Sequence, residues 1–185
     1  MDKRILVLLA EGCEEMEVVI PSDLAIRAGL EVVMAGVEGI DITGAHGISL
    51  IADCELVDIA DEIFDAVIIP GGMPGAENIS NNEVAMEVIQ RHADRDKLIC
   101  AICAAPGVVL GETRILDNHF ATCYPGFEKH FNSSVSYIDE MVSVSGNIIT
   151  AKGPGAAFQF GREILKALLG EVIADKVVKG TFFSC

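Results

Sequence analysis

Three short apolar runs constrain the fold of this 185-residue chain more than any other feature. Residues 3–10, 65–70 and 98–102 are almost continuously apolar, which is typical of buried strands that are covered on both faces. Each run is followed by a loop of small or acidic residues and then by a helical pattern. Because strands that alternate with helices form a parallel, doubly wound sheet, we expect one α/β domain over residues 1–185.

The rest of the chain continues this alternation, with two antiparallel interruptions. A helical pattern over 18–28 ends at Gly29, and Pro21 marks either its start or a kink. Short alternating pieces between residues 39 and 53 indicate a small antiparallel excursion. The other expected elements are a strand over 31–36, a helix over 82–93, a strand over 119–123, a hairpin over 141–152 that turns at Gly146-Asn147, a helix between 153–155 and Gly170, and a helical segment over 172–178.

The charge and hydropathy of the chain exclude several classes of partner. With 13 basic and 28 acidic residues, the formal net charge is -15, so phosphate backbones and anionic lipids are repelled. We therefore expect no stable binding of nucleic acid or membranes. No apolar stretch reaches the roughly twenty residues of a membrane helix, and Glu11 follows the apolar start at once, as in a first strand rather than a signal peptide. A cytoplasmic location is the default expectation.

The six cysteines are spread through the sequence and are expected to be free thiols: Cys13, Cys54, Cys100, Cys103, Cys123 and Cys185. Cys100 and Cys103 have the spacing of a redox pair, but Cys100 falls inside a strand, where residues three apart point to opposite faces. The four histidines show no ligand spacing with the cysteines. We therefore expect neither a dithiol centre nor a metal site.

Cys103 is the strongest candidate for chemistry. It falls where the apolar run 98–102 turns into a second apolar stretch with helical character, and Pro106 sits where a first-turn proline is tolerated. A thiol at this bend points out of the carboxyl edge of the sheet, at the positive end of a helix, which favours an acidified nucleophile. The alternative is a buried structural cysteine, which an arbitrary cysteine in an apolar run usually is.

Three loops are expected to converge on Cys103, because sites in such sheets form at the carboxyl ends of the strands. These are residues 11–17, 71–78 and 103–107. The Gly71-Gly72 amides, with the amide of Ala104, are suited to an oxyanion; alternatively the glycines only serve a tight turn. One carboxyl group from the first loop would stay protonated beside a thiolate and shuttle protons. Spacing does not choose among the four candidates Glu11, Glu14, Glu15 and Glu17.

Several motifs in order along the chain resemble the ThiJ/PfpI superfamily, and more closely its branch that holds the Parkinson-disease protein DJ-one and the bacterial protein YajL. They are Glu-Glu-Met-Glu at 14–17, Val-Ile-Pro at 19–21, Arg-Ala-Gly at 27–29, Pro-Gly-Gly at 70–72, Gly-Ala-Glu-Asn at 75–78, Ala-Ile-Cys-Ala at 101–104 and Gly-Pro-Gly at 153–155.

The resemblance implies a flavodoxin-like α/β fold: a doubly wound, mostly parallel sheet with helices on both faces and a small antiparallel hairpin. It also implies a homodimer. Cys103 would be the reactive nucleophile and Glu17 its protonated partner, and the amides of Gly72 and Ala104 would match the family's oxyanion pocket.

The chain also departs from the family's patterns. The protease-like branch has a histidine directly after the cysteine, where this chain has Ala104, so peptide hydrolysis is not expected. Tyr124 stands where the human-type branch has a histidine near the thiol, and it could donate a hydrogen bond to substrate. Arg27 matches one arginine that acts across the family's dimer, and His46 takes the place of another.

The resemblance implies a cysteine-dependent enzyme without cofactor. Members of the family are described as glyoxalases that convert methylglyoxal to lactate, as deglycases of early glycation adducts, and as oxidative-stress sensors or chaperones. We expect a glyoxalase or deglycase that acts on methylglyoxal-type 2-oxoaldehydes or their adducts and gives a 2-hydroxy acid. The alternative is a sensor or chaperone that works through oxidation of Cys103, with little turnover. A purely structural domain is the third interpretation.

Overall fold

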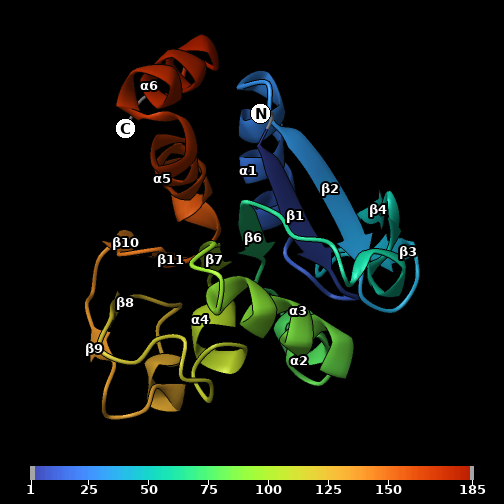
Figure 1. Cartoon of the computed structure of the whole chain (residues 1–185), viewed down its shortest axis with the longest axis vertical. Coiled ribbons are helices and arrows are strands. Elements are labelled where there is room, and N and C mark those ends of the chain that lie inside the picture. Colours follow the sequence, from blue (N-terminus) through green and yellow to red (C-terminus); the bar gives the residue numbers. More distant parts are fainter. Residues whose placement is uncertain (1–2, 184–185) are drawn as a thin grey trace.

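The computed structural model describes residues 3–183, and within them it forms a seven-stranded, mostly parallel sheet (Figure 1). The strand order is β10-β11-β7-β6-β1-β2-β5. The first strand, β1, lies inside the sheet. The strands β2 and β5 lie on one side of it, and β6, β7, β11 and β10 lie on the other, which is the doubly wound arrangement expected from the sequence. The strands are β1 (Arg4–Leu9), β2 (Glu31–Gly36), β5 (Cys54–Glu55), β6 (Ala66–Ile69), β7 (Leu98–Ile102) and β11 (Ile148–Ala151), all parallel, and β10 (Val142–Ser145), antiparallel to β11.

Helices cover both faces of the sheet, which explains why β1 is apolar along its whole length. Successive side chains of a strand point to opposite faces. Ile5, Val7 and Leu9 belong to one core, and Leu6 and Leu8 to the other. The first core is covered by α1 (Glu15–Arg27), α5 (Ala157–Leu169) and α6 (Glu171–Gly180), and the second by α2 (Gly75–Ser80), α3 (Glu83–Ala93) and α4 (Ala105–Val108). Figure 1 shows the red C-terminal helices beside the blue α1.

The expected small elements are present, with one exception in length. The excursion is an antiparallel pair, β3 (Asp41–Thr43) and β4 (Ser49–Ile51), and β10 and β11 form the expected hairpin around Gly146. The strand expected over 119–123 is only β8 (Phe120–Ala121), which pairs with β9 (Ser136–Tyr137). Three 3-10 turns complete the described elements: η1 (Leu56–Ile59), η2 (Glu128–His130) and η3 (Pro154–Ala156).

Two helices differ from the sequence-based expectation. The first helix begins at Glu15 and runs through Pro21, and it lies so close to α5 that a Cβ at Gly161 would be 2.7 Å from Leu24 Cδ1. Packing against α5 therefore holds together a helix that lacks one N–H donor. The second helix, α2 at Gly75–Ser80, was expected to be loop, because its glycine and asparagine content is typical of turns.

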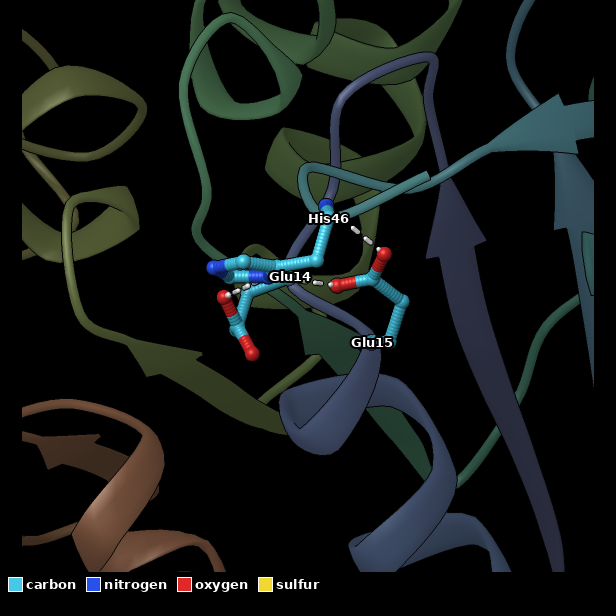
Figure 2. A group of neighbouring side chains, drawn as sticks. All are labelled: Glu14, Glu15 and His46. Carbon is cyan, nitrogen blue, oxygen red and sulfur yellow. Dashed lines mark hydrogen bonds and ion pairs between the residues drawn. The ribbon is translucent and has the colours of Figure 1, made fainter. Parts of the chain in front are cut away.

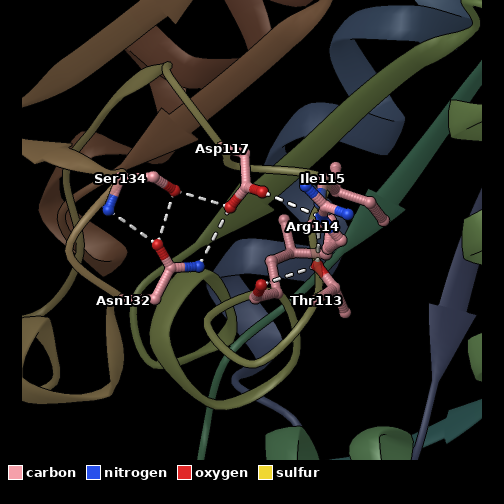
Figure 3. Close-up of polar contacts among 7 residues, drawn as sticks. Thr113, Arg114, Ile115, Asp117, Asn132 and Ser134 are labelled. Atoms are coloured by element: carbon pink, nitrogen blue, oxygen red, sulfur yellow. Dashed lines mark hydrogen bonds and ion pairs between the residues drawn. The ribbon is translucent and has the colours of Figure 1, made fainter.

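A polar cluster around Asp117 fixes the irregular segment between α4 and β9 (Figure 3). The carboxylate of Asp117 accepts hydrogen bonds from Ser134 Oγ at 2.6 Å and Asn132 Nδ2 at 3.0 Å, and it also pairs with Arg114. The bonds from Asn132 and Ser134 join Asp117 to residues that are fifteen and seventeen positions away along the chain. They brace the segment that carries Tyr124. Among residues 3–183, no helix has the length and apolar character that crossing a membrane requires.

Candidate functional site

The three predicted loops do converge, because they follow the neighbouring strands β1, β6 and β7. The backbone N–H of Glu14 donates to the carbonyl of Gly71 at 3.1 Å, and that of Gly75 donates to the carbonyl of Gly12 at 3.3 Å. A Cβ added to Gly71 would lie 2.6 Å from Cys103 Cβ. Parallel pairing of the strands thus brings together residues that are more than thirty positions apart.

Cys103 lies on a sharp and strained bend at the end of β7. Its φ is 65°, in the left-handed region that costs a residue with a Cβ about 1–2 kcal/mol. Two hydrogen bonds of 2.8 Å hold the bend: Cys103 N–H donates to the carbonyl of Ala151, and Tyr124 N–H donates to the carbonyl of Cys103. The residue is partly exposed, so the interpretation as a sealed structural cysteine does not hold.

The helix after Cys103 is much shorter than expected. It is a single turn, α4 at Ala105–Val108, and Pro106 lies in its first positions. One turn has only a small dipole, so a helix end is a weak source of acidification for the thiol. The backbone N–H groups of Gly72 and Ala104 form hydrogen bonds to Cys103 that lower the pKa of its thiol, but burial outweighs them and the pKa is raised overall.

Glu17 is the carboxyl group that the fold places beside the thiol. It lies in the first turn of α1, is 0% exposed, and accepts a hydrogen bond at 2.8 Å from Gly71 N–H on its Oε2 atom. Its Oε1 atom is buried and has no hydrogen-bond partner within the described residues. Burial raises the pKa of Glu17 to about 7, although the bonds from Gly71 and Cys103 lower it. This carboxyl group is thus poised to exchange a proton near neutral pH.

At pH 7 the pair formed by Cys103 and Glu17 is midway between no charge and one negative charge, because burial raises the pKa of Glu17 to about 7. Burial first, and then the charge of an ionised Glu17, raise the pKa of the Cys103 thiol to about 12. The expected acidified thiol is therefore not a property of the bend by itself. Two acids in contact titrate as a pair, so a thiolate forms here when the proton resides on Glu17.

The two glycines of the β6–α2 loop have different roles. The single N–H of Gly71 is engaged by Glu17, so Gly71 positions the acid and does not donate to an oxyanion, contrary to its predicted role. Gly72 faces the thiol and has a φ of 84°, and a Cβ there would lie 2.5 Å from Glu14 N and from Gly12 O. Gly72 and Ala104 are the pair of amides that meet at Cys103.

Tyr124 reaches the site through its backbone. Its amide holds Cys103, while its ring is 46% exposed and packs near Gly153 and Phe127. The ring lines a small apolar cavity of about 250 Å³ with Pro125, Met141 and residues 152–156. A hydrogen bond from the Tyr124 hydroxyl to substrate remains a prediction.

The two residues predicted to act across a dimer lie outside the thiol contacts. Arg27 is ten residues after Glu17 on α1, about 15 Å along the helix, and pairs with Asp23 at 2.6 Å. His46, in the turn between β3 and β4, contacts Glu14 and Glu15. Their roles across a dimer stay predictions.

The other cysteines near the site differ from Cys103 in exposure, since Cys13, Cys100 and Cys123 are each 0% exposed. Burial raises the pKa of Cys13 to about 11 and of Cys123 to about 12, and it raises the pKa of Cys100 well above its usual range. The cysteines that the structure describes are all free, as predicted, and Cys185 lies outside the described residues. These thiols thus pack in the core, whereas Cys103 opens to the surface.

One cluster was missed by the sequence analysis. Glu14, Glu15 and His46 each offer a ligand atom, and these atoms lie within 4.8 Å of one another (Figure 2). Such a group can in principle hold a metal ion, whereas no metal site was expected. Spacing gave no signal, because 31 positions separate Glu15 from His46 and only the β3–β4 turn brings them together.

Comparisons with known proteins show which family the chain resembles over most of its length. The DJ-1/PfpI family model matches residues 3–167. The chain is 35% identical over 179 residues to "Glutathione-independent glyoxalase DJR-1.2" of Caenorhabditis elegans, covering 96% of this chain and 95% of that protein. The crystal structure of Drosophila melanogaster DJ-1beta superposes with a TM-score of 0.95 at 33% identity and covers both chains completely.

A plant relative shows that the same unit occurs within longer proteins. "Protein DJ-1 homolog B" of Arabidopsis thaliana is 34% identical over 176 residues, which are 95% of this chain but 40% of that protein. The chain thus spans less than half of that relative. From the match of the family model over 3–167 and the full-length similarity to other members, we conclude that this chain belongs to the DJ-1/PfpI family.

Proposed function

We propose that this protein converts small 2-oxoaldehydes such as methylglyoxal into 2-hydroxy acids, with Cys103 as nucleophile and Glu17 as proton relay. One observation carries the proposal: a buried carboxyl group with a pKa of about 7 faces a partly exposed thiol at which two backbone amides converge. A nucleophile, a proton carrier and an oxyanion pocket are the groups that addition to an aldehyde needs.

The first step is addition of the thiolate to the aldehyde carbon. The new C–S bond uses a sulfur electron pair, and the carbonyl electrons move to oxygen, where the amides of Gly72 and Ala104 stabilise the charge. That oxygen then takes the proton of Glu17, which leaves Glu17 ionised, and the product is a hemithioacetal. Protonated Glu17 stabilises the starting thiolate, because a neutral acid donates a hydrogen bond to sulfur without repelling it.

The second stage moves a proton between neighbouring carbons. Ionised Glu17 takes the proton from the carbon bound to sulfur, and it returns a proton to the former ketone carbon, which gives a 2-hydroxy thioester. Water then attacks the thioester and the C–S bond breaks, so that the thiol is restored. The sum is one 2-oxoaldehyde and one water giving one 2-hydroxy acid, and these steps use no metal, glutathione or nucleotide.

The family relationship supports this proposal. One relative of similar length carries the name "Glutathione-independent glyoxalase DJR-1.2". The same addition chemistry would serve a deglycase, in which the aldehyde carbon is already bound to an amine of a protein.

Purified protein should therefore form lactate from methylglyoxal, and Cys103→Ser should lose at least about 1,000-fold in kcat/KM. A matched control is Cys54→Ser, since Cys54 is a partly buried cysteine on the edge strand β5. If Cys103→Ser and the wild type form lactate at equal rates, the proposal is wrong.

A second candidate is an oxidative-stress sensor or chaperone that acts through the oxidation state of Cys103. The observation in its favour is the unpartnered Oε1 of Glu17, which in its protonated form would donate to a sulfinate oxygen. Intact mass after mild peroxide separates the two functions. Gain of two oxygens at Cys103 with negligible aldehyde turnover would support the sensor.

Assembly as a homodimer and a cytoplasmic location belong to the same proposal. The solvent face of α1 carries exposed Met16, Val19 and Ile26, and Ile51 of β4 is 69% exposed. Exposed apolar side chains at helical spacing are suited to a second copy of the chain. Ile26→Glu should lower the mass measured by light scattering from that of a dimer to that of a monomer. An unchanged mass would place the interface elsewhere.

A further inference from the structure

Glu15 anchors the turn between β3 and β4 to the start of α1. Its Oε1 atom accepts hydrogen bonds from the backbone N–H groups of His46 at 2.8 Å and Ile48 at 3.3 Å, and its Oε2 atom lies 3.0 Å from Nδ1 of His46. Gly44 leaves the space that this carboxylate fills, since a Cβ there would lie 2.3 Å from Oε1. The turn is thus built around one buried carboxylate.

Glu14 places a second carboxylate beside His46, so the stability of the turn depends on the protonation of this imidazole. Its carboxylate is only 10% exposed and lies 3.3 Å from the same Nδ1 of His46 (Figure 2). Nδ1 carries one hydrogen, and two carboxylates face it. A protonated imidazole balances part of this negative charge, whereas a neutral one leaves two neighbouring carboxylates to repel each other.

The turn adjoins the reactive site through the loop after β1. Ala45 N–H donates to the carbonyl of Cys13, and Gly12 N–H donates to the carbonyl of Thr43, both at 2.8 Å. The next residue in that loop, Glu14, donates its N–H to Gly71, which in turn positions Glu17. Backbone hydrogen bonds therefore connect the 43–48 turn to the loop after β1, and this loop to Gly71, which contacts Glu17.

We propose that protonated His46, with Glu14 and Glu15, forms a clamp that holds the 43–48 turn against this loop and so positions the Cys103 site. This inference rests on the proposed function and adds His46 to it as a positioning residue. The titratable groups that face the clamp are Glu14 and Glu15 themselves, Glu11, whose carboxylate accepts from Thr43 N–H, and Cys13. The Glu15 hydrogen bond and the two acidic charges raise the pKa of His46.

A metal ion is the competing occupant of these three side chains. The oxygens of Glu15, however, already accept hydrogen bonds from three N–H groups, two backbone and one imidazole. An ion would have to displace the imidazole hydrogen bond, so the contacts favour the clamp. Adding EDTA or zinc to the assay decides this point: activity that EDTA removes and zinc restores would overturn the clamp.

The experiment combines a titration of His46 by NMR with pH profiles of kcat/KM for methylglyoxal. In the wild type, kcat/KM should fall as pH rises through the His46 pKa, by about tenfold. In His46→Arg the side chain at position 46 stays positively charged, so kcat/KM should not decrease in this way up to pH about 10. His46→Gln should have the low activity at every pH. His46 is mostly exposed, so these changes leave the core intact. His130→Arg, another exposed histidine, should keep the wild-type profile.

Glu15→Gln tests the clamp independently of turnover. The NMR pKa of His46 should fall toward about 6.5, and the decrease in activity should move to lower pH with it. The clamp is wrong if His46→Arg keeps the wild-type decrease at the same pH, or if Glu15→Gln leaves the pKa of His46 unchanged. If the wild type does not turn over methylglyoxal, the proposed function fails, and the rate of Cys103 alkylation by iodoacetamide replaces kcat/KM in the same pH series.

Discussion

The backbone N–H of Gly71 donates to Oε2 of Glu17 at 2.8 Å, and Oε1 of the same carboxyl group is buried with no hydrogen-bond partner among residues 3–183. This contact ties the carboxyl group of Glu17 to the loop that follows β6. A glycine is required at position 71 because a side chain there would meet both Cys103 and Glu17.

Replacing Glu17 by Gln should separate thiol ionisation from turnover. An amide removes the negative charge and can still accept from Gly71 and donate to sulfur, so the pKa of Cys103 should fall, as measured by thiolate absorbance. The amide cannot relay a proton, so kcat for methylglyoxal should drop at least about 100-fold. A variant with more thiolate and unimpaired turnover would remove Glu17 from the mechanism.

The same substitution should change how stability depends on pH. The native pKa of Glu17 is raised to about 7, so the native state holds this proton more tightly than the unfolded chain does. Stability from this group is complete below about pH 4.5 and is lost as pH rises toward 7. We expect the free energy of unfolding in urea, taken as Glu17→Gln minus wild type, to increase between pH 5 and pH 8 by on the order of 2 kcal/mol. If this difference in unfolding free energy is the same at every pH, the pKa of Glu17 is not raised in the native state.

Gly71→Ala should disturb the site without unfolding the protein. A Cβ would lie 2.6 Å from Cys103 Cβ and 2.9 Å from Glu17 Oε2, so the two reacting groups must move apart. We expect kcat/KM to fall about 100-fold, because small misplacements of reacting groups have effects of this size. Gly180→Ala is the matched control, since no atom lies within 4 Å of its added Cβ. If the two variants are equally active, Cys103 and Glu17 do not lie close enough to Gly71 for an added Cβ to displace them.

The strain at Cys103 predicts an unusual order of stabilities. At a φ of 65°, glycine is unstrained whereas alanine keeps the cost of its Cβ. Cys103→Gly should therefore unfold at a higher urea concentration than Cys103→Ala, with a difference of about 1 kcal/mol. The reverse order, which is usual at regular positions, would mean that the bend relaxes in solution.

His92 should make the protein lose stability in mild acid. Its Nε2 accepts from Phe64 N–H at 2.9 Å, its Nδ1 donates to the carbonyl of Val88 at 2.7 Å, and burial lowers its pKa. The unfolded chain binds a proton below about pH 6.5, so stability should fall from there down to the lower native pKa, by at most about 1.4 kcal/mol per pH unit. In His92→Gln, the free energy of unfolding measured in urea should decrease less between pH 6.5 and the native pKa than in the wild type. In His130→Gln it should decrease as in the wild type.

The local pattern of the sequence predicts most of the fold. Apolar runs at 3–10, 65–70 and 98–102 became β1, β6 and β7, because a strand buried on both faces needs apolar residues at every position. The bend at Cys103 was also predicted from its neighbours. The start of α1 at Glu15, ahead of Pro21, and the helix at Gly75 were not predicted, since packing against α5 and against the β1 loop outweighs local preference there.

The separate roles of Gly71 and Gly72 and the contact of His46 with Glu15 were decided only by the tertiary structure. Residue spacing left four glutamates open, and the family resemblance pointed to Glu17. The structure places Glu17 against Gly71, 54 positions away, and His46 against Glu15, 31 positions away. Such contacts follow from parallel strand pairing and loop packing, whose energies depend on the whole fold, whereas strands and bends are determined by residues that are neighbours in the chain.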